Sequence, residues 1–324
     1  MRESPTHNRQ RRNLDVTVSA NIGFNIAQYW RAENAEDRKV IRALSTPGLL
    51  SEAESTVGPY TDGNDYSIAG DVRRAGFNVY LIEKKRPRFH LSYFGSLDEE
   101  EHKTGPYSAK TFAVLEQLDE VIGQLRRAAE KIGGGRAIIC IVSDHGFKLT
   151  DKEVNVNSAL REAGLIEVDA RGKVKSWRAF AWYGGGSAGI MLRDEADNEA
   201  RKTAGDILHR LASDPSSGVA MVGDRAAARS MGGFPDAAFV VALRPGFRLG
   251  SKLEGPVTVA VRPGGTHGYA PDVAEMNSSF FIAGPGIAAG RNMGQIDMRD
   301  IAPTLATLLG VKLPSADGRS LSLR

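Results

Sequence analysis

A long amphipathic helix followed by a fully apolar strand limits the possible folds more than any other feature. Over residues 108–131, apolar side chains recur at spacings of three and four, which predicts one buried helix face, at Leu115, Leu118, Ile122 and Leu125. Residues 137–142 follow as an apolar, β-branched run, typical of a strand buried on both faces of a parallel sheet. With the alternating segment Phe89–Phe94 before the helix, this order predicts a βαβ unit. We therefore expect an α/β fold with a mostly parallel sheet flanked by helices.

The rest of the chain adds further core elements and an inserted region. Residues 256–261 and 279–282 are expected as core strands, and residues 299–309 as a last helix. Shorter signals, including a Gly184-Gly185-Gly186 turn between two strands, predict an insert or cap in between. The predicted division is an irregular N-terminal segment, a core in two pieces and the insert, at 1–65, at 66–164 with 256–324, and at 165–255.

Composition and charge exclude several classes of protein. Among 324 residues, 42 Lys and Arg against 39 Asp and Glu give a net charge of +3, which predicts no nucleic-acid patch. The longest apolar run, Ala237–Leu243, is much shorter than the roughly 20 residues of a membrane span. The basic N-terminus has no apolar stretch after it, so no signal peptide is expected and the chain as written is cytoplasmic.

Three stretches carry side chains of the kinds that bind metal ions. Asp98 and His102 are four residues apart, which places them on one side of a helical turn. Asp144 and His145 come directly after the apolar strand, where open α/β sheets bind their ligands. His267 lies between glycines, which indicates close backbone approach in a loop. Each stretch alone also has a structural explanation: a solvated acidic turn, a helix cap or a structural histidine.

Taken together, these five residues favour a metal centre. Each stretch follows a predicted strand, so the side chains can meet at one edge of the sheet. Mixed aspartate and histidine ligands suit zinc or a similar divalent ion. Five ligands are more than one tetrahedral ion needs, which predicts two ions about 4 Å apart and a phosphoryl-transfer chemistry.

The ordered motifs resemble the alkaline phosphatase superfamily, and within it the type I phosphodiesterase/nucleotide pyrophosphatase family. The resemblance rests on Asp98-x-x-x-His102 with Lys-Thr-Gly-Pro after it, then Ser143-Asp144-His145-Gly146, then Gly265-Thr266-His267-Gly268-Tyr269. Near the end, Phe281-Ile-Ala-Gly-Pro-Gly286 and Asp300-Ile-Ala-Pro-Thr-Leu-Ala306 are also similar to that family. The resemblance runs from about residue 66 to the last residue.

The resemblance implies roles for the same residues. Asp98, His102 and His267 match the positions that hold one zinc ion, and Asp144 and His145 match two ligands of the other. The family completes the second ion with an Asp after the first core strand and with a Thr or Ser nucleophile, and the sequence shows neither pattern. Asp15 follows no apolar strand, and Thr46 is a weak nucleophile candidate. The first core strand is therefore expected to be missing and the second metal site to be incomplete.

Two functions follow as alternatives. One is a metal-dependent hydrolase of small phosphate esters or nucleotides, with Tyr269 and the insert shaping its substrate pocket. The other is an N-terminally truncated, catalytically inactive remnant of such an enzyme, in which case any signal peptide would be lost with the N-terminus. A sulfatase-like or mutase-like relative is weaker, because Cys140 lies inside a predicted strand and cannot serve as the nucleophile. Substrate identity, compartment and oligomeric state stay open.

Overall fold

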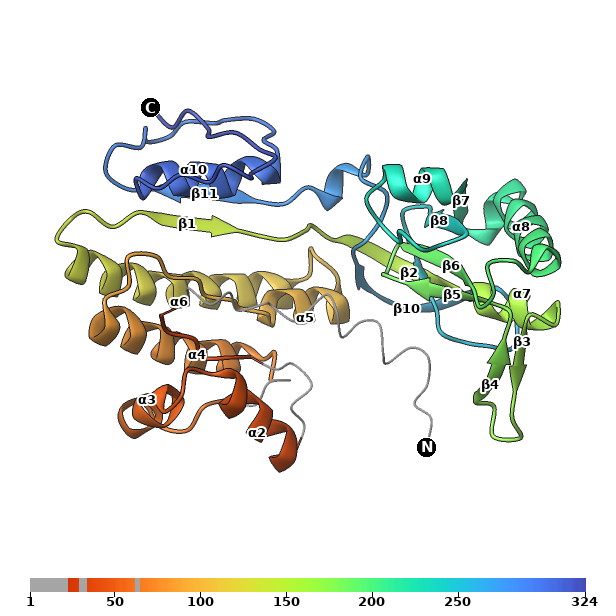
Figure 1. The fold of residues 1–324 in the computed structure, drawn as a ribbon, viewed down its shortest axis with the longest axis horizontal. Coiled ribbons are helices and arrows are strands. Elements are labelled where there is room, and N and C mark those ends of the chain that lie inside the picture. The colour runs from red at the N-terminus through yellow and green to blue at the C-terminus, as the bar shows by residue number, and fades with distance from the viewer. Residues whose placement is uncertain (1–22, 29–33, 62–64) are drawn as a thin grey trace. The chain divides into compact units, whose positions relative to one another are not determined.

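The computed structural model describes residues 23–28, 34–61 and 65–324, and these form two compact units. We call residues 97–115 and 144–278 the mixed unit, because it holds most of the strands. Residues 23–96, 116–143 and 279–324 form the helical unit. Figure 1 shows the elements of both units. Asp15 lies outside the described residues.

The mixed unit is built on antiparallel strands. Its largest sheet has the order β5-β6-β8-β7, and a second sheet has the order β10-β2-β9, in which only β2 and β9 are parallel. A hairpin of β3 and β4 completes the strands. The helices and strands of the mixed unit, in chain order, are α5 (Ser96–Thr104, with Ser96 in the helical unit), β2 (Lys148–Val154), α7 (Val156–Glu162), β3 (Ile166–Val168), β4 (Val174–Trp177), β5 (Ala179–Tyr183), β6 (Ser187–Leu192), α8 (Asn198–Ser213), β7 (Val219–Asp224), α9 (Arg225–Ser230), β8 (Phe239–Leu243), β9 (Phe247–Leu249) and β10 (Thr258–Thr266).

One continuous hydrophobic core holds the mixed unit together. Val154, Leu160, Ile190, Leu208 and Val241 are fully buried there, and they come from strands of both larger sheets and from helices α7 and α8. Burying a side chain of this size stabilises the fold by about 1.5–3 kcal/mol relative to leaving it exposed. The region expected as an insert thus shares its core with residues on both sides of it.

The helical unit has a two-stranded sheet and a smaller core. Strands β1 and β11 pair antiparallel, and α2, α3 and α4 bury a separate apolar cluster that includes Ile41, Leu50 and Phe77. The helices are α2 (Ala35–Leu44), α3 (Leu49–Val57), α4 (Ile68–Tyr80), which continues as a π-helical turn (Leu81–Lys85), α6 (Ala109–Gly133, whose first residues belong to the mixed unit) and α10 (Ile301–Leu308), and the strands are β1 (Ile139–Val142) and β11 (Phe280–Ala283).

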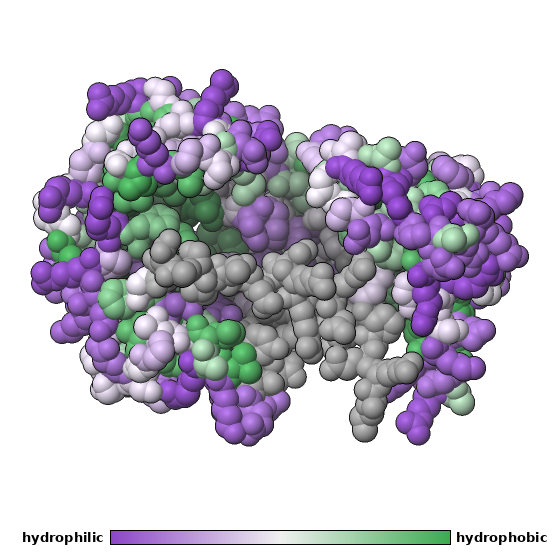
Figure 2. Space-filling view, viewed as in Figure 1, coloured by the Kyte–Doolittle hydropathy of each residue, from purple (hydrophilic) through white to green (hydrophobic). Residues whose placement is uncertain are grey.

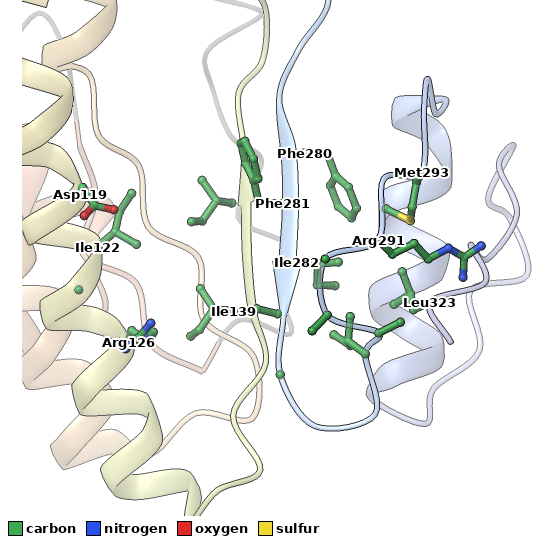
Figure 3. Close-up of a pocket in the computed structure, with 18 of the residues that line it drawn as sticks. Asp119, Ile122, Arg126, Ile139, Phe280, Phe281, Ile282, Arg291, Met293 and Leu323 are labelled. Atoms are coloured by element: carbon green, nitrogen blue, oxygen red, sulfur yellow. The ribbon is translucent and has the colours of Figure 1, made fainter. Parts of the chain in front are cut away.

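A cavity of about 760 Å³ lies beside the two-stranded sheet of the helical unit. Ile122 of α6, Ile139 and Ile141 of β1 and Phe281 of β11 are among its lining residues. Figure 3 shows side chains of α6 and of both strands around this space, and Figure 2 shows hydrophobic residues gathered in a recess where these elements lie. The two strands therefore leave much apolar surface uncovered within the described part of the chain.

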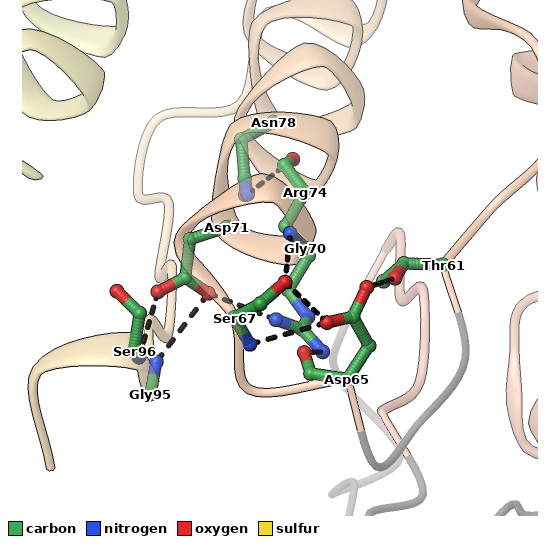
Figure 4. Close-up of polar contacts among 9 residues, drawn as sticks. All are labelled: Thr61, Asp65, Ser67, Gly70, Asp71, Arg74, Asn78, Gly95 and Ser96. Carbon is green, nitrogen blue, oxygen red and sulfur yellow. Dashed lines mark hydrogen bonds and ion pairs between the residues drawn. The ribbon is translucent and has the colours of Figure 1, made fainter. Parts of the chain in front are cut away.

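A buried ion pair in the helical unit holds the start of α5. Asp71 and Arg74 of α4 are 0% and 3% exposed, and their side chains are 2.8 Å apart. Figure 4 shows the Asp71 carboxylate accepting hydrogen bonds from the backbone N–H groups of Gly95 (3.4 Å) and Ser96 (2.9 Å). Ser96 is the first residue of α5 and Gly95 directly precedes it, and helices leave the N–H groups at this end without partners inside the helix. Asp71 therefore satisfies backbone N–H groups at the N-terminal end of α5.

The structure confirms the α/β class and most of the predicted elements, and it corrects three expectations. Phe89–Phe94 is not a strand, because no described strand lies beside it to form a ladder, so the βαβ unit does not form. The strand pairs are mostly antiparallel rather than parallel, since β1 pairs with the returning strand β11. Residues 264–266 belong to β10 rather than to a loop, because a bulge after Ala260 brings them back into register with β2. The predicted domain boundaries stay predictions.

Candidate metal centre

Three side chains from three separate segments of the mixed unit come together. Asp98 lies in the first half of α5, His145 lies before β2, and His267 follows the last residue of β10. One potential ligand atom from each lies within 4.8 Å of the other two. The sequence predicted all three as metal ligands, and the structure places them in one cluster.

The distances within this cluster suit a single divalent ion. Oδ1 of Asp98 lies 3.8 Å from Nε2 of His145 and 3.8 Å from Nε2 of His267. Zinc holds such atoms at about 2.0–2.2 Å, so two ligand atoms of one tetrahedral ion lie about 3.3–3.6 Å apart, slightly closer than the two separations found here. Oδ1 of Asp98 is buried and has no hydrogen-bond partner among the described residues. A buried carboxylate oxygen without a partner is costly, and a cation between these three atoms would compensate it.

His102 and Asp144 lie at the margin of this cluster. Nε2 of His102 is 3.6 Å from Oδ2 of Asp98, whereas His145 and His267 lie nearest to Oδ1. Asp144 reaches the cluster through His145, with 3.6 Å between Oδ2 and Nε2, and its side chain is 74% exposed. The structure thus brings three of the other four predicted residues, His102, His145 and His267, within 3.6–3.8 Å of Asp98. The division of the five residues between two ions stays a prediction.

Backbone carbonyls orient two of the imidazole rings. Nδ1 of His102 lies 3.1 Å from the Gly265 carbonyl oxygen, and Nδ1 of His145 lies 3.2 Å from that of Gly146. Because a carbonyl oxygen only accepts, each Nδ1 carries the proton and donates it. This tautomer leaves the Nε2 lone pair of both rings free on the side of Asp98, which is how proteins prepare histidines as metal ligands.

The electrostatics of the cluster also favour metal binding. Burial, together with the neighbouring His145 and His102, lowers the pKa of His267 to about 4, so this ring is neutral at neutral pH. Neutral imidazole is the form that coordinates metals. Burial raises the pKa of the Asp98 carboxyl, although the two nearby histidines partly oppose the shift. A bound cation would stabilise the ionised form of Asp98.

A buried phenyl ring supports the three histidines, and the sequence prediction missed it. Phe147 is 6% exposed, and its ring centroid lies 4.8, 5.6 and 5.2 Å from those of His102, His145 and His267. The rings of His145 and His267 stack, with centroids 3.7 Å apart. Position 147 directly after Gly146 could be read in the sequence only as another apolar residue. Its role becomes visible once the three segments are packed together.

Close packing explains the glycines next to His267. A Cβ atom on Gly264 would lie 2.6 Å from the carbonyl oxygen of His102, and one on Gly265 would overlap that of Glu101. The end of α5 therefore lies directly on β10, which is the close backbone approach, though not the loop, that the glycines predicted. Tyr269 is buried in the hydrophobic core, and its hydroxyl contacts the carbonyl of Phe247, so it does not line an open substrate pocket.

Thr46, the weak nucleophile candidate, has a structural role in the helical unit. Its hydroxyl accepts a hydrogen bond of 2.9 Å from the backbone N–H of Asn25. Within the described part of the chain, none of the helices is long and apolar enough to cross a bilayer.

Comparison with known proteins places this arrangement in a family. The family model for type I phosphodiesterase/nucleotide pyrophosphatase matches residues 6–270. Human bis(5'-adenosyl)-triphosphatase ENPP4 is 23% identical over 145 residues, which cover 43% of this chain. The match covers 32% of that relative, so the chain spans about a third of its length.

Solved structures show the same fold. Human ectonucleotide pyrophosphatase/phosphodiesterase 5 has a TM-score of 0.58 at 16% identity, covering 76% of this chain and 61% of the other. The murine protein, in an inactive form in complex with AMP, has a TM-score of 0.57 with the same identity and coverage. The motif order, the cluster of Asp98, His145 and His267, the family match and the shared fold agree. The chain belongs to the type I phosphodiesterase/nucleotide pyrophosphatase family of the alkaline phosphatase superfamily.

Proposed function

We propose that this protein is a metal-dependent phosphodiesterase or nucleotide pyrophosphatase that acts on small phosphate esters. The observation that carries the proposal is the buried Oδ1 of Asp98, which lies 3.8 Å from Nε2 of both His145 and His267. Membership of the family supports the reaction class. The AMP complex of the murine structural relative supports a nucleotide or nucleotide-like substrate.

Zinc is the ion that this donor set fits best, because one carboxylate and two imidazoles are typical of catalytic zinc sites that keep a position open. When bound, such an ion supplies Lewis-acid polarisation of a phosphoryl oxygen and charge stabilisation of a leaving oxygen. The residues of the chain hold and orient it. Asp98 supplies negative charge, the carbonyls of Gly146 and Gly265 set the ring tautomers, and Phe147 excludes water from behind the histidines.

A second ion is a further part of the proposal. His102 and Asp144 are the remaining candidates for a two-metal arrangement around Asp98 and His145. In such an arrangement one ion would face the attacking oxygen and the other the leaving oxygen of the phosphate ester. The exposed Asp144 is open to solvent and therefore accessible to a substrate.

A metal-binding protein without turnover is the second candidate function. The observation that favours it is the exposure of Asp144, 74%, combined with its single contact to the cluster through His145. Because Nε2 of His145 already belongs to the three-residue cluster, a second ion held by Asp144 and water would bind weakly, since even the loss of an indirect supporting group costs about 10–100-fold in metal affinity. On this reading the residues that complete the second site in the family are lacking.

Hydrolysis of bis(p-nitrophenyl) phosphate by zinc-loaded protein separates the two candidates. We expect turnover that the His145→Ala variant loses and that the His209→Ala variant keeps, because His209 is exposed on α8. Elemental analysis of the same dialysed samples reports metal content. Bound zinc without turnover above the His145→Ala level would favour the inactive protein. The absence of both bound zinc and turnover would refute both candidates.

A further inference from the structure

The Gly184–Gly186 loop of the mixed unit packs directly on the segment that carries His267. It joins β5 and β6, and the sequence indicated only a turn there. The N–H of Gly186 donates a hydrogen bond of 2.8 Å to the carbonyl oxygen of His267 itself. Gly186 is buried, and a Cβ atom on it would lie 2.5 Å from the ring of Tyr269, two residues after the histidine.

Two other strands donate backbone hydrogen bonds to the loop. The N–H of Leu243 at the end of β8 donates to the carbonyl of Gly186, and the N–H of Leu249 in β9 donates to that of Gly185, both at 2.9 Å. The N–H of Gly184 closes the hairpin on the carbonyl of Ser187 at 2.9 Å. The loop thus connects the largest sheet and β9 to the backbone of His267.

The three glycines differ sharply in the space around them. A Cβ atom on Gly185 would overlap the carbonyl oxygen of His267 and lie 2.8 Å from Oγ1 of Thr266, and its φ of +86° also disfavours other residues. A Cβ atom on Gly184 would meet only the ring of Phe234, at an ordinary 3.9 Å. On the other side of His267, Gly268 has a φ of +74°, and a Cβ atom on it would overlap the carbonyl oxygen of Gly184. Backbone therefore meets backbone on both sides of the histidine.

We propose that the Gly184–Gly186 loop is a positioning element that sets the place of the His267 ring relative to Asp98. The loop touches no ligand atom and acts through the backbone of His267. A shift of a few tenths of an ångström would change the 3.8 Å separation between Nε2 of His267 and Oδ1 of Asp98. The inference rests on the proposed metal site and does not require turnover.

Alanine substitution at successive positions tests this proposal with controls inside the same loop. Gly185→Ala and Gly186→Ala should weaken Co²⁺ binding by about 10–100-fold, the range for lost supporting contacts, and should alter the visible absorption of the bound ion. Gly184→Ala should bind Co²⁺ like the wild type. Gly172→Ala should also do so, because Gly172 has a φ of +74° but no atom within 4 Å of its Cβ position, and thus controls for backbone strain alone.

A second measurement needs no metal, and circular dichroism controls for folding defects. Side-chain ¹⁵N NMR of the metal-free protein should show shifted His267 resonances in Gly185→Ala and Gly186→Ala, and unchanged ones in Gly184→Ala and Gly172→Ala, with circular dichroism confirming that each is folded. If the wild type binds no Co²⁺, the metal site is refuted. Shifted His267 resonances in Gly185→Ala and Gly186→Ala would then still support the positioning role of the loop. Unchanged resonances, or equal Co²⁺ affinity in all four folded variants, would overturn the positioning role.

Discussion

Asp98 is the residue on which the candidate metal centre depends most. Its Oδ1 faces His145 and His267, and its Oδ2 faces His102. A spacing of four residues in the sequence was enough to predict that Asp98 and His102 share one side of a helix, and α5 confirms it. The meeting with His145 and His267 could be predicted only as a possibility of strand ends, because it depends on how distant segments pack.

Glu101 makes the stability of the metal-free protein depend on pH. Burial and the nearby Asp98 raise the pKa of Glu101 from 4.5 to about 7. Between these values the folded protein holds a proton that the unfolded chain has lost, so its stability falls as the pH rises through this window. We expect Glu101→Gln to flatten this fall, measured as the free energy of unfolding against pH in the presence of a chelator. Parallel curves for both proteins would contradict the expectation.

At the scale of elements, local patterns predicted several helices and most strands, and Phe89–Phe94 is the exception among the strands. The spacing of apolar residues in 108–131 and 299–309 predicted α6 and α10, because a helix forms its backbone hydrogen bonds within the same segment. The alternation in Phe89–Phe94 was misleading, since a strand also needs a neighbour that no local pattern reveals. Pairing direction, the bulge in β10 and the support from Phe147 likewise arise from distant contacts and left no local signal.

The anchoring of α5 by Asp71 has a measurable energetic consequence. Asp71→Ala takes the carboxylate away from the buried Arg74, which keeps its hydrogen bond to the Asp65 carbonyl, and removes the acceptor of the Ser96 N–H. Breaking a buried pair in this way costs about 3–5 kcal/mol, so we expect a loss of that size in the free energy of unfolding, measured with urea. Loss of an exposed pair costs less than about 1 kcal/mol.

The Glu36→Ala variant is the matched control, because Glu36 and Lys39 form an exposed ion pair on α2. It should change the free energy of unfolding by much less than Asp71→Ala does. Equal losses in the two variants would show that burial of the Asp71–Arg74 pair has no special weight.

At the scale of the whole molecule, the edge of β1 that faces away from β11 pairs with none of the described strands. Ser143 donates its N–H to Ser279, so by the antiparallel alternation the backbone groups of Cys140 and Val142 point away from β11. Val142 and Phe281 are 49% and 64% exposed. An apolar strand edge of this kind pairs readily with other chains.

We therefore expect concentration-dependent association that a charge on this edge suppresses. Sedimentation velocity should show the wild type forming larger species as its concentration rises, and Val142→Lys should remain smaller. Val311→Lys adds the same charge at an exposed apolar residue outside any strand and should behave like the wild type. A wild type that stays a single species at all concentrations would contradict the expectation.

Equilibrium zinc binding tests the central claim most directly. Competition with a chromogenic chelator should show zinc bound to the wild type and to His209→Ala. Asp98→Asn, His145→Ala and His267→Ala should each lose more than about tenfold in affinity, since even indirect supporting groups contribute that much. The account predicts this separation between the three cluster residues and the surface histidine. Zinc binding that is equal in all five proteins, or absent from the wild type, would contradict it.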